Sequence, residues 1–168
     1  MKLKELLITA TAMSALFLGG CATATSPASA SSFVSEAGEG GMAEVQLASL
    51  AVTRSQNPDV KDFGKRMIDD HSKANDELKP IAASKSMTLP KEIGANEKAL
   101  YDKLSKLSGA EFDKEYVKAM VEDHEKDVKT FQNQAQNGTD PEIKAFAAKT
   151  LPILQEHLQM IQNIKAKM

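Results

Sequence analysis

The chain has 168 residues, of which 42% are hydrophobic, 26% charged and 5% aromatic, and it contains no tryptophan. This composition is typical of a single soluble domain with an aliphatic, helix-prone core, and it argues against a second domain. The 21 basic and 23 acidic residues are interspersed, so the sequence has neither the basic stripe of a nucleic-acid-binding protein nor an acidic tail for a cationic partner. We therefore expect no nucleic-acid partner.

Residues 1–21 have the regions of a secretory signal. Two lysines near the start precede an apolar run over residues 6–18, and small residues precede Cys21. The run is too short to be a permanent membrane span. Its end, Leu-Gly-Gly-Cys at residues 18–21, resembles the bacterial lipobox, which implies that Cys21 carries a lipid and becomes the new N-terminus. The alternative is ordinary secretion with cleavage at a later small-residue site, such as residues 28–30.

Residue 22 is Ala rather than Asp, which in the resembling lipoproteins usually means transfer to the outer membrane. We therefore expect an outer-membrane lipoprotein that faces the periplasm and contacts the membrane through its lipid anchor, with a soluble periplasmic protein as the alternative. Because Cys21 is the only cysteine, the chain forms no intramolecular disulfide. Residues 22–32, ATATSPASASS, are typical of a flexible low-complexity tether, and the folded domain is expected over residues 33–168.

The domain contains four long segments with helical periodicity and clear turn signals between them. The segments cover approximately residues 33–55, 58–84, 109–137 and 141–168. Asn57-Pro58 and Asp140-Pro141 each combine a good N-cap with proline at the first helical position. No segment has the period-two alternation of a strand, so the sequence predicts an all-α fold.

A repeat indicates how these helices are arranged. Residues 57–63, NPDVKDF, align with residues 140–146, DPEIKAF, at an offset of 140 − 57 = 83. The second and fourth long helices therefore begin alike, as expected for two related helical hairpins. Residues 85–108 include a short helix around 96–107 and are long enough to run the length of a bundle. The sequence predicts a ferritin-like four-helix bundle with a long crossover between its second and third long helices.

Four motifs in this order and spacing resemble the bacterial family catalogued as domain of unknown function 4142. They are GGMAEVQLASLA, NPDVKDFGKRMIDDHSKANDEL, SGAEFDKEYVKAMVEDHEKDV and DPEIKAFAAKTLPILQEHLQM. The resemblance covers essentially everything from Phe33 onward. It implies a ferritin-like bundle exported to the periplasm or the outer membrane, and it implies no established activity.

One ionisable residue lies within the apolar stripe of each long helix. These residues are Glu44, His71, His124 and His157. At about 1.5 Å per residue, Glu44 lies roughly 17 Å before the first hairpin turn and His71 roughly 20 Å after it. The other two histidines lie roughly 20 and 25 Å from the second turn. We expect the four groups to meet in one layer of the core.

Burying four polar groups together is costly unless they satisfy one another or hold a ligand. A metal ion of the copper, zinc, iron or manganese type would satisfy them, and so would a metal-free Glu-His network or a water-filled pocket. The Glu-x-x-His motif of di-iron bundles is absent, because Ile68, Val121 and Leu154 stand three residues before the histidines. This absence argues against ferroxidase chemistry.

Three methionines are weaker candidate ligands. Met67 and Met120 stand four residues before their histidines, and Met160 stands three after His157. Imidazole together with thioether suits copper, whereas three imidazoles and one carboxylate suit zinc or iron. The alternative is that the methionines only fill gaps in the core, where Tyr116 is also expected as a packing aromatic.

The acids directly before the histidines are Asp70, Asp123 and Glu156. They lie about 100° round the helix from the apolar stripe, so we expect them in solvent or in salt bridges. The sequence predicts an envelope lipoprotein of unknown physiological role whose bundle core has candidate ligands for a transition metal, with a metal-free structural or stress-related envelope module as the alternative. It contains neither a nucleophile motif nor a phosphate loop, so only redox metal chemistry would make it an enzyme. Association between subunits stays open.

Replacing Cys21 by Ser should prevent lipidation. We expect Cys21→Ser to accumulate as a slower-migrating precursor or as an unanchored soluble species. Membrane fractionation and labelling with a radioactive fatty acid measure this. Unchanged fractionation together with unchanged labelling would contradict the lipid anchor.

Overall fold

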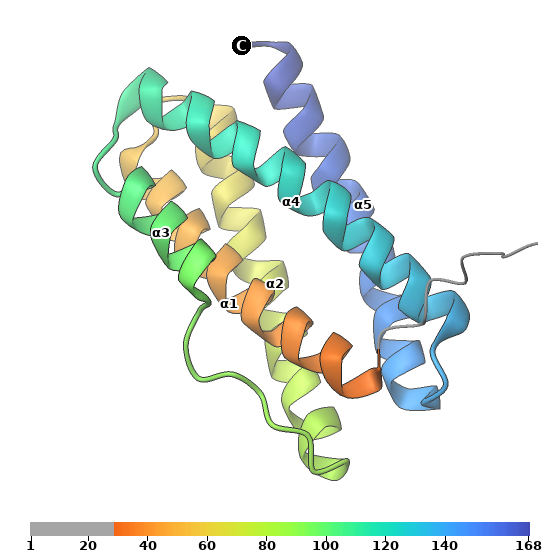
Figure 1. The fold of residues 1–168 in the computed structure, drawn as a ribbon. Coiled ribbons are helices and arrows are strands. Elements are labelled where there is room, and N and C mark those ends of the chain that lie inside the picture. Colours follow the sequence, from red (N-terminus) through yellow and green to blue (C-terminus); the bar gives the residue numbers. More distant parts are fainter. Residues whose placement is uncertain (1–28) are drawn as a thin grey trace, which may run out of the picture.

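A computed structural model describes residues 29–168, and these contain five α-helices and no strand (Figure 1). The predicted signal over residues 1–21, the lipidation of Cys21 and most of the predicted tether lie outside this range. The helices are α1 (Ala30–Arg54), α2 (Pro58–Ser84), α3 (Ala95–Leu104), α4 (Gly109–Asn137) and α5 (Pro141–Ala166). The predicted all-α fold is confirmed.

The two predicted Asn-Pro and Asp-Pro starts cap their helices. The side chain of Asn57 accepts a hydrogen bond from the backbone N–H of Asp59 at 2.9 Å. Asp140 accepts from the N–H groups of Glu142 and Ile143 at 3.1 and 3.0 Å. In both cases proline follows the cap and lacks the N–H that the first turn would leave unpaired.

Two helix ends differ from the sequence prediction. Helix α1 begins at Ala30, three residues before the expected start, because Ser29 caps it by accepting from Ser32 N–H at 3.2 Å. Phe33 and Val34 are then buried within its second turn. Helix α1 therefore includes residues 30–32, which the sequence analysis assigned to the tether. Helix α3 ends at Leu104, where a turn takes over, rather than at residue 107.

The long helices form two hairpins that pack into one bundle. Helix α1 lies along α2, α4 lies along α5, and the hairpins meet through contacts of α2 with α5 and of α1 with α4 (Figure 1). The connection from α2 to α4 returns along the bundle and carries α3, which packs against α1 and α4. This is the long crossover with a short helix that the sequence predicted. Within residues 29–168, no helix has the length and apolar character needed to cross a bilayer.

Each long helix carries two apolar stretches with one polar residue between them. One apolar cluster, near the hairpin turn of α1 and α2, includes Leu47, Phe63, Met120 and Ile161. The other, towards the opposite end of the bundle, includes Phe33, Leu78, Phe131 and Leu154. Glu44, His71, His124 and His157 stand between the two clusters along the sequence of every long helix, and we call them the polar layer.

A glycine lets α1 and α2 approach closely on the turn side of the polar layer. A Cβ atom at Gly64 would lie 3.0 Å from the carbonyl oxygen of Ala48 and 3.1 Å from Cβ of Ala51. Both distances are tighter than ordinary van der Waals contact, so a larger side chain would push the helices apart. Ala48 is one turn beyond Glu44, so this contact helps to set how far Glu44 stands from α2.

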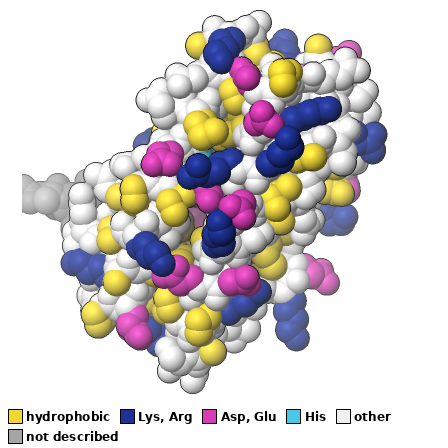
Figure 2. All heavy atoms as spheres, turned by 180° about the vertical axis from the view of Figure 1, so that it is seen from behind, with side chains coloured by type: hydrophobic (Ala, Val, Ile, Leu, Met, Phe, Trp, Pro, Cys, Tyr) yellow, Lys and Arg dark blue, Asp and Glu magenta, His cyan; other side chains and the backbone are white. Residues whose placement is uncertain are grey.

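The outer surface carries charges of both signs. On the face seen in Figure 2, acidic and basic side chains are interspersed. Exposed ion pairs join helices, such as Lys149 with Glu77 at 2.6 Å and Lys167 with Asp59 at 2.8 Å. Exposed pairs of this kind add little stability, so packing of the two apolar clusters carries the fold.

Candidate metal centre

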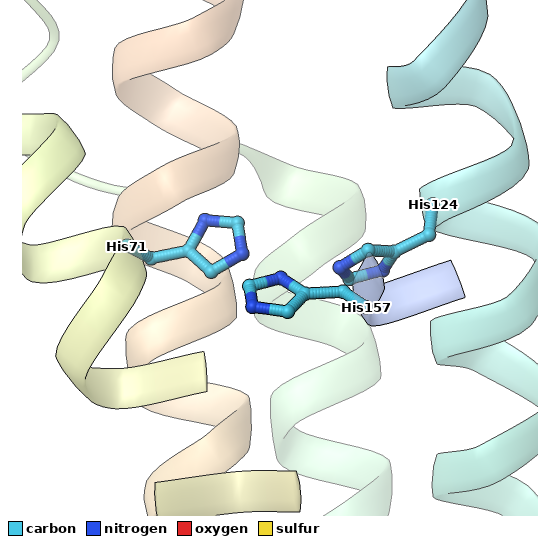
Figure 3. A group of neighbouring side chains, drawn as sticks. All are labelled: His71, His124 and His157. Carbon is cyan, nitrogen blue, oxygen red and sulfur yellow. The ribbon is translucent and has the colours of Figure 1, made fainter. Parts of the chain in front are cut away.

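The structure brings the four residues of the polar layer together in the middle of the bundle. His71 comes from α2, His124 from α4 and His157 from α5, and the three rings point toward one another (Figure 3). Their ring centroids are 5.3 to 5.9 Å apart. One ring nitrogen from each lies within 4.8 Å of the others. The rings are 0 to 6% exposed, and Glu44 of α1 is 2% exposed.

Hydrogen bonds fix the protonated nitrogen of two of the rings. His124 Nδ1 lies 3.0 Å from the carbonyl oxygen of Met120, one turn earlier. A carbonyl only accepts, so Nδ1 carries the hydrogen and Nε2 of a neutral His124 keeps a free lone pair. His157 Nε2 lies 2.9 Å from Asp70 Oδ2. Because Asp70 also pairs with Arg66 and is a carboxylate, Nε2 donates and Nδ1 of His157 keeps its lone pair.

Glu44 lies close to both His71 and His124. Its Oε2 lies 2.8 Å from His71 Nδ1, and its Oε1 lies 3.5 Å from His124 Nε2. The first is a strong hydrogen bond, whereas the second is too long to be one. When Glu44 is a carboxylate, His71 Nδ1 donates to it and His71 Nε2 is left unprotonated.

The polar layer thus contains several buried atoms without a partner. Across residues 29–168, the buried side-chain atoms without a hydrogen-bond partner include His71 Nε2, His124 Nε2, His157 Nδ1 and Glu44 Oε1. Each histidine therefore uses one nitrogen for a hydrogen bond and leaves the other unpaired. An unsatisfied buried polar group costs about 1–3 kcal/mol, so this arrangement is unfavourable unless something fills it. Lone pairs that face one another are what a cation requires.

Burial also keeps the rings neutral. Desolvation, and then the neighbouring histidines, lower the pKa of His124 to about 3. Burial lowers the pKa of His71 and of His157 to about 4, although nearby acids partly oppose this. Neutral imidazole is the form that binds metals, so the rings need no deprotonation near pH 7. Burial, and then the charge of Asp123, raise the pKa of Glu44 well above its usual range.

Asp70 has a role that the sequence analysis missed. It forms the expected salt bridge with Arg66, but its side chain is only 12% exposed and it also holds His157 of α5. Partial burial raises the pKa of Asp70, and the hydrogen bonds from Arg66 and His157 outweigh this effect and hold the pKa below its usual range. Glu156 of α5 is 65% exposed and forms a salt bridge with Arg66 at 3.3 Å, in keeping with the expected solvent or salt-bridge position.

Asp123 and Asp127 are half-buried rather than solvated. One oxygen from each lies within 4.8 Å of an oxygen of Glu44. Burial, and then the charge of Glu44, raise the pKa of Asp127 to about 9, and burial also raises the pKa of Asp123. The sequence analysis did not single out Asp127, although its position three residues after His124 puts it on the same side of α4.

The methionines are not equivalent. Met67 and Met120 are fully buried and pack in the apolar cluster with Phe63 and Tyr116. Met160 is 36% exposed, so it does not reach the buried layer. The ring of Phe63 lies 6.2 and 6.1 Å from the rings of His124 and His157, so the apolar cluster forms one wall of the histidine group.

Comparison with known families identifies the chain's relatives. The family model called Domain of unknown function (DUF4142) matches residues 19–164. The chain belongs to this family. Among curated proteins, none matches this DUF4142 chain.

Solved structures with a similar fold come from proteins of low sequence identity. A DUF305 fragment from Deinococcus radiodurans is 14% identical, with a TM-score of 0.73, over 85% of the DUF4142 chain and 100% of its own. A DUF305 protein from Streptomyces coelicolor, described as secreted, is 13% identical with a TM-score of 0.70, over 84% and 94% of the chains. A protein called CopM in its Cu(I)-bound form is 15% identical with a TM-score of 0.69, over 83% and 96%. These likenesses establish a shared helical-bundle fold.

The depressed pKa of His124 predicts a specific pH dependence of stability. The folded chain keeps this ring neutral down to about pH 3, whereas the unfolded chain protonates it below about pH 6.5. The contribution of the neutral His124 ring to the free energy of unfolding is therefore fully present above pH 6.5 and is lost as the pH falls below that value. In metal-free protein, His124→Gln should flatten the rise of the unfolding free energy with pH between 4.5 and 6 by up to about 1.4 kcal/mol per pH unit.

The comparison between variant and wild type isolates this effect. Glu44 and Asp127 have raised pKa values, so they change stability with pH in the opposite direction in both proteins. Urea denaturation in the presence of a chelator, repeated across the pH range, measures the difference in slope. Parallel curves for the two proteins would show that His124 is not held neutral by burial.

Proposed function

We propose that this protein binds one transition metal ion in the core of its bundle and serves to hold that metal in the cell envelope. The proposed ligands are His71 Nε2, His124 Nε2 and His157 Nδ1. Glu44 is the fourth candidate ligand through Oε1, while its Oε2 orients His71. Met67 and Met120 stay packing residues in this proposal, and Met160 is left out because it is exposed.

The proposal rests on the hydrogen bond that each histidine ring makes through one of its two nitrogens. Every histidine has one nitrogen engaged by a different partner: a backbone carbonyl for His124, Asp70 for His157 and, when it is ionised, Glu44 for His71. Metal-binding histidines almost always use their second nitrogen in this way, because the bond fixes the tautomer and the ring orientation. Histidines that only filled space would not have to be oriented by three separate hydrogen bonds. Nor would one nitrogen of each ring have to stay without a partner.

Copper is the first candidate for the metal. Neutral imidazole suits copper, zinc and iron, and it is a poor choice for magnesium or calcium. CopM, which shares the fold, has been solved with Cu(I) and with Cu(II). Zinc is the second candidate, since three imidazoles with one carboxylate are typical zinc ligands. Manganese suits this nitrogen-rich set less well.

The burial of the rings favours holding a metal over catalysis at it. His124 and His157 are 0% exposed and His71 is 6% exposed. A substrate would need an open position beside the metal, and the two apolar clusters close the layer from above and below. Such an enclosed site suits a buffer or store, from which metal exchanges slowly.

The cell envelope is the proposed location. The lipobox-like residues before Cys21 support export and attachment to the outer membrane. The related fold of a protein described as secreted is in keeping with this location. We propose the membrane as a partner through the lipid alone, with the bundle in the periplasm.

Metal binding should stabilise the folded chain. Because the ligands come together only on folding, free metal at about a hundredfold above its dissociation constant should add about 2.7 kcal/mol to the free energy of unfolding. Titration of metal-free protein with Cu(I) under anaerobic conditions, Cu(II) and Zn²⁺, followed by thermal denaturation, measures this. His71→Gln and His124→Gln should each fold and lose most of the stabilisation.

Two aspartates of α2 provide graded controls. Asp69→Asn changes a side chain that is 64% exposed and paired only with Lys73, so metal binding should stay as in the wild type. Asp70→Asn removes the charge that orients His157 and should weaken metal binding about 10- to 100-fold. If no metal raises the melting temperature and elemental analysis finds no stoichiometric metal, the polar layer is a metal-free hydrogen-bonded network.

A further inference from the structure

A second group of side chains that could bind a metal ion lies beside the histidines, and its members offer only carboxylate oxygens. It consists of Glu44 from α1 with Asp123 and Asp127 from α4, whose nearest oxygens lie within 4.8 Å of one another. Glu44 joins this group to the histidines, because its Oε2 lies 2.8 Å from His71 Nδ1. Its Oε1 lies 3.5 Å from His124 Nε2 and has no hydrogen-bond partner within residues 29–168.

The free oxygen of Glu44 points to a missing ligand. The side chain of Glu44 is 2% exposed, and within residues 29–168 its Oε1 has no hydrogen-bond partner. Two further carboxyl groups beside it add repulsion rather than partners when they are ionised. A divalent cation among the three would provide the positive charge that this buried oxygen lacks.

A pocket open to solvent borders two members of this group, whereas Glu44 is not part of its lining. It has a volume of about 870 Å³, lies between α1, α3 and α4, and is lined by Asp123 and Asp127. Four more acids line it, namely Glu36, Glu39, Glu97 and Glu122. The one lysine of its lining, Lys126, is paired with Glu36 at 2.8 Å. Unlike the mixed charges in Figure 2, this lining concentrates negative charge and attracts cations.

We propose that Glu44, Asp123 and Asp127 form a second cation site beside this pocket, distinct from the histidine centre. A set of carboxylate oxygens without nitrogen or sulfur suits hard divalent cations of the Mn²⁺, Mg²⁺ and Ca²⁺ class. The site does not require that the histidines bind metal. Because Oε2 of Glu44 is engaged by His71, both sites would draw on Oε1, and the occupancy of one site would affect the other.

Mn²⁺ is the probe for this site, since the electron paramagnetic resonance signal of free Mn²⁺ disappears when the ion is bound. Titration of the full chain should show one bound Mn²⁺. Asp123→Asn and Asp127→Asn, singly and together, should each weaken Mn²⁺ binding by about tenfold or more, because each removes a charged ligand. These near-isosteric changes should keep the circular dichroism spectrum of the wild type.

Two variants distinguish this site from the histidine centre. Glu122→Gln removes an acid from the same pocket outside the carboxylate group and should bind Mn²⁺ as the wild type does. His124→Gln combined with His157→Gln should lose Cu²⁺ and Zn²⁺ binding and keep Mn²⁺ binding. Absence of Mn²⁺ binding in the wild type, or equal binding by the Asp123 and Asp127 variants, would overturn the second site. Loss of Mn²⁺ binding in the histidine variant would show that one site had been mistaken for two.

Discussion

The arrangement of the polar layer depends on the bond between Glu44 and His71. Both are almost fully buried, and their oxygen and nitrogen are 2.8 Å apart between the two apolar clusters of the bundle. Burying a carboxyl group at this depth is strongly unfavourable without a partner. The bond therefore fixes the register of α1 against α2, and the close approach at Gly64 allows it.

The same constraint explains why the core is divided. Along every long helix, one apolar stretch ends before the polar layer and another begins after it. Each helix must deliver a single polar side chain to the same height, so the positions of the turns are as important as the apolar stripes. The caps at Asn57 and Asp140 set the start of α2 and α5, and hence the heights of His71 and His157.

The helices and the members of the polar layer could be predicted from sequence, because period, caps and depth are local properties. Whether an acidic side chain next to a histidine in the sequence faces solvent depends on the neighbouring helices, so it is not a local property. Asp70 lies about 100° round α2 from His71. It contacts His157 only because α5 packs against that side of α2. Asp127 could have been recognised from the sequence, because a residue three positions after His124 lies on the same side of the helix. The choice of nitrogen on each ring depends on acceptors from other turns or helices and could not be predicted.

The methionines show what helical spacing does not determine. Spacing alone put Met67, Met120 and Met160 near the histidines, yet the first two fill the apolar cluster and the third is exposed. A helical period of 3.6 residues tells which side a residue faces, and it does not tell how far the side chain reaches toward the bundle axis. Side-chain length and the helix neighbours decide that.

X-ray absorption spectroscopy of the metal-loaded protein tests the central claim most directly. The account predicts a first shell with three imidazole nitrogens at about 2.0–2.1 Å, recognised by the multiple scattering of the imidazole ring. Loss of one imidazole contribution in His157→Gln would assign it to that residue. A first shell of sulfur, or of oxygen without imidazole scattering, would contradict the histidine centre.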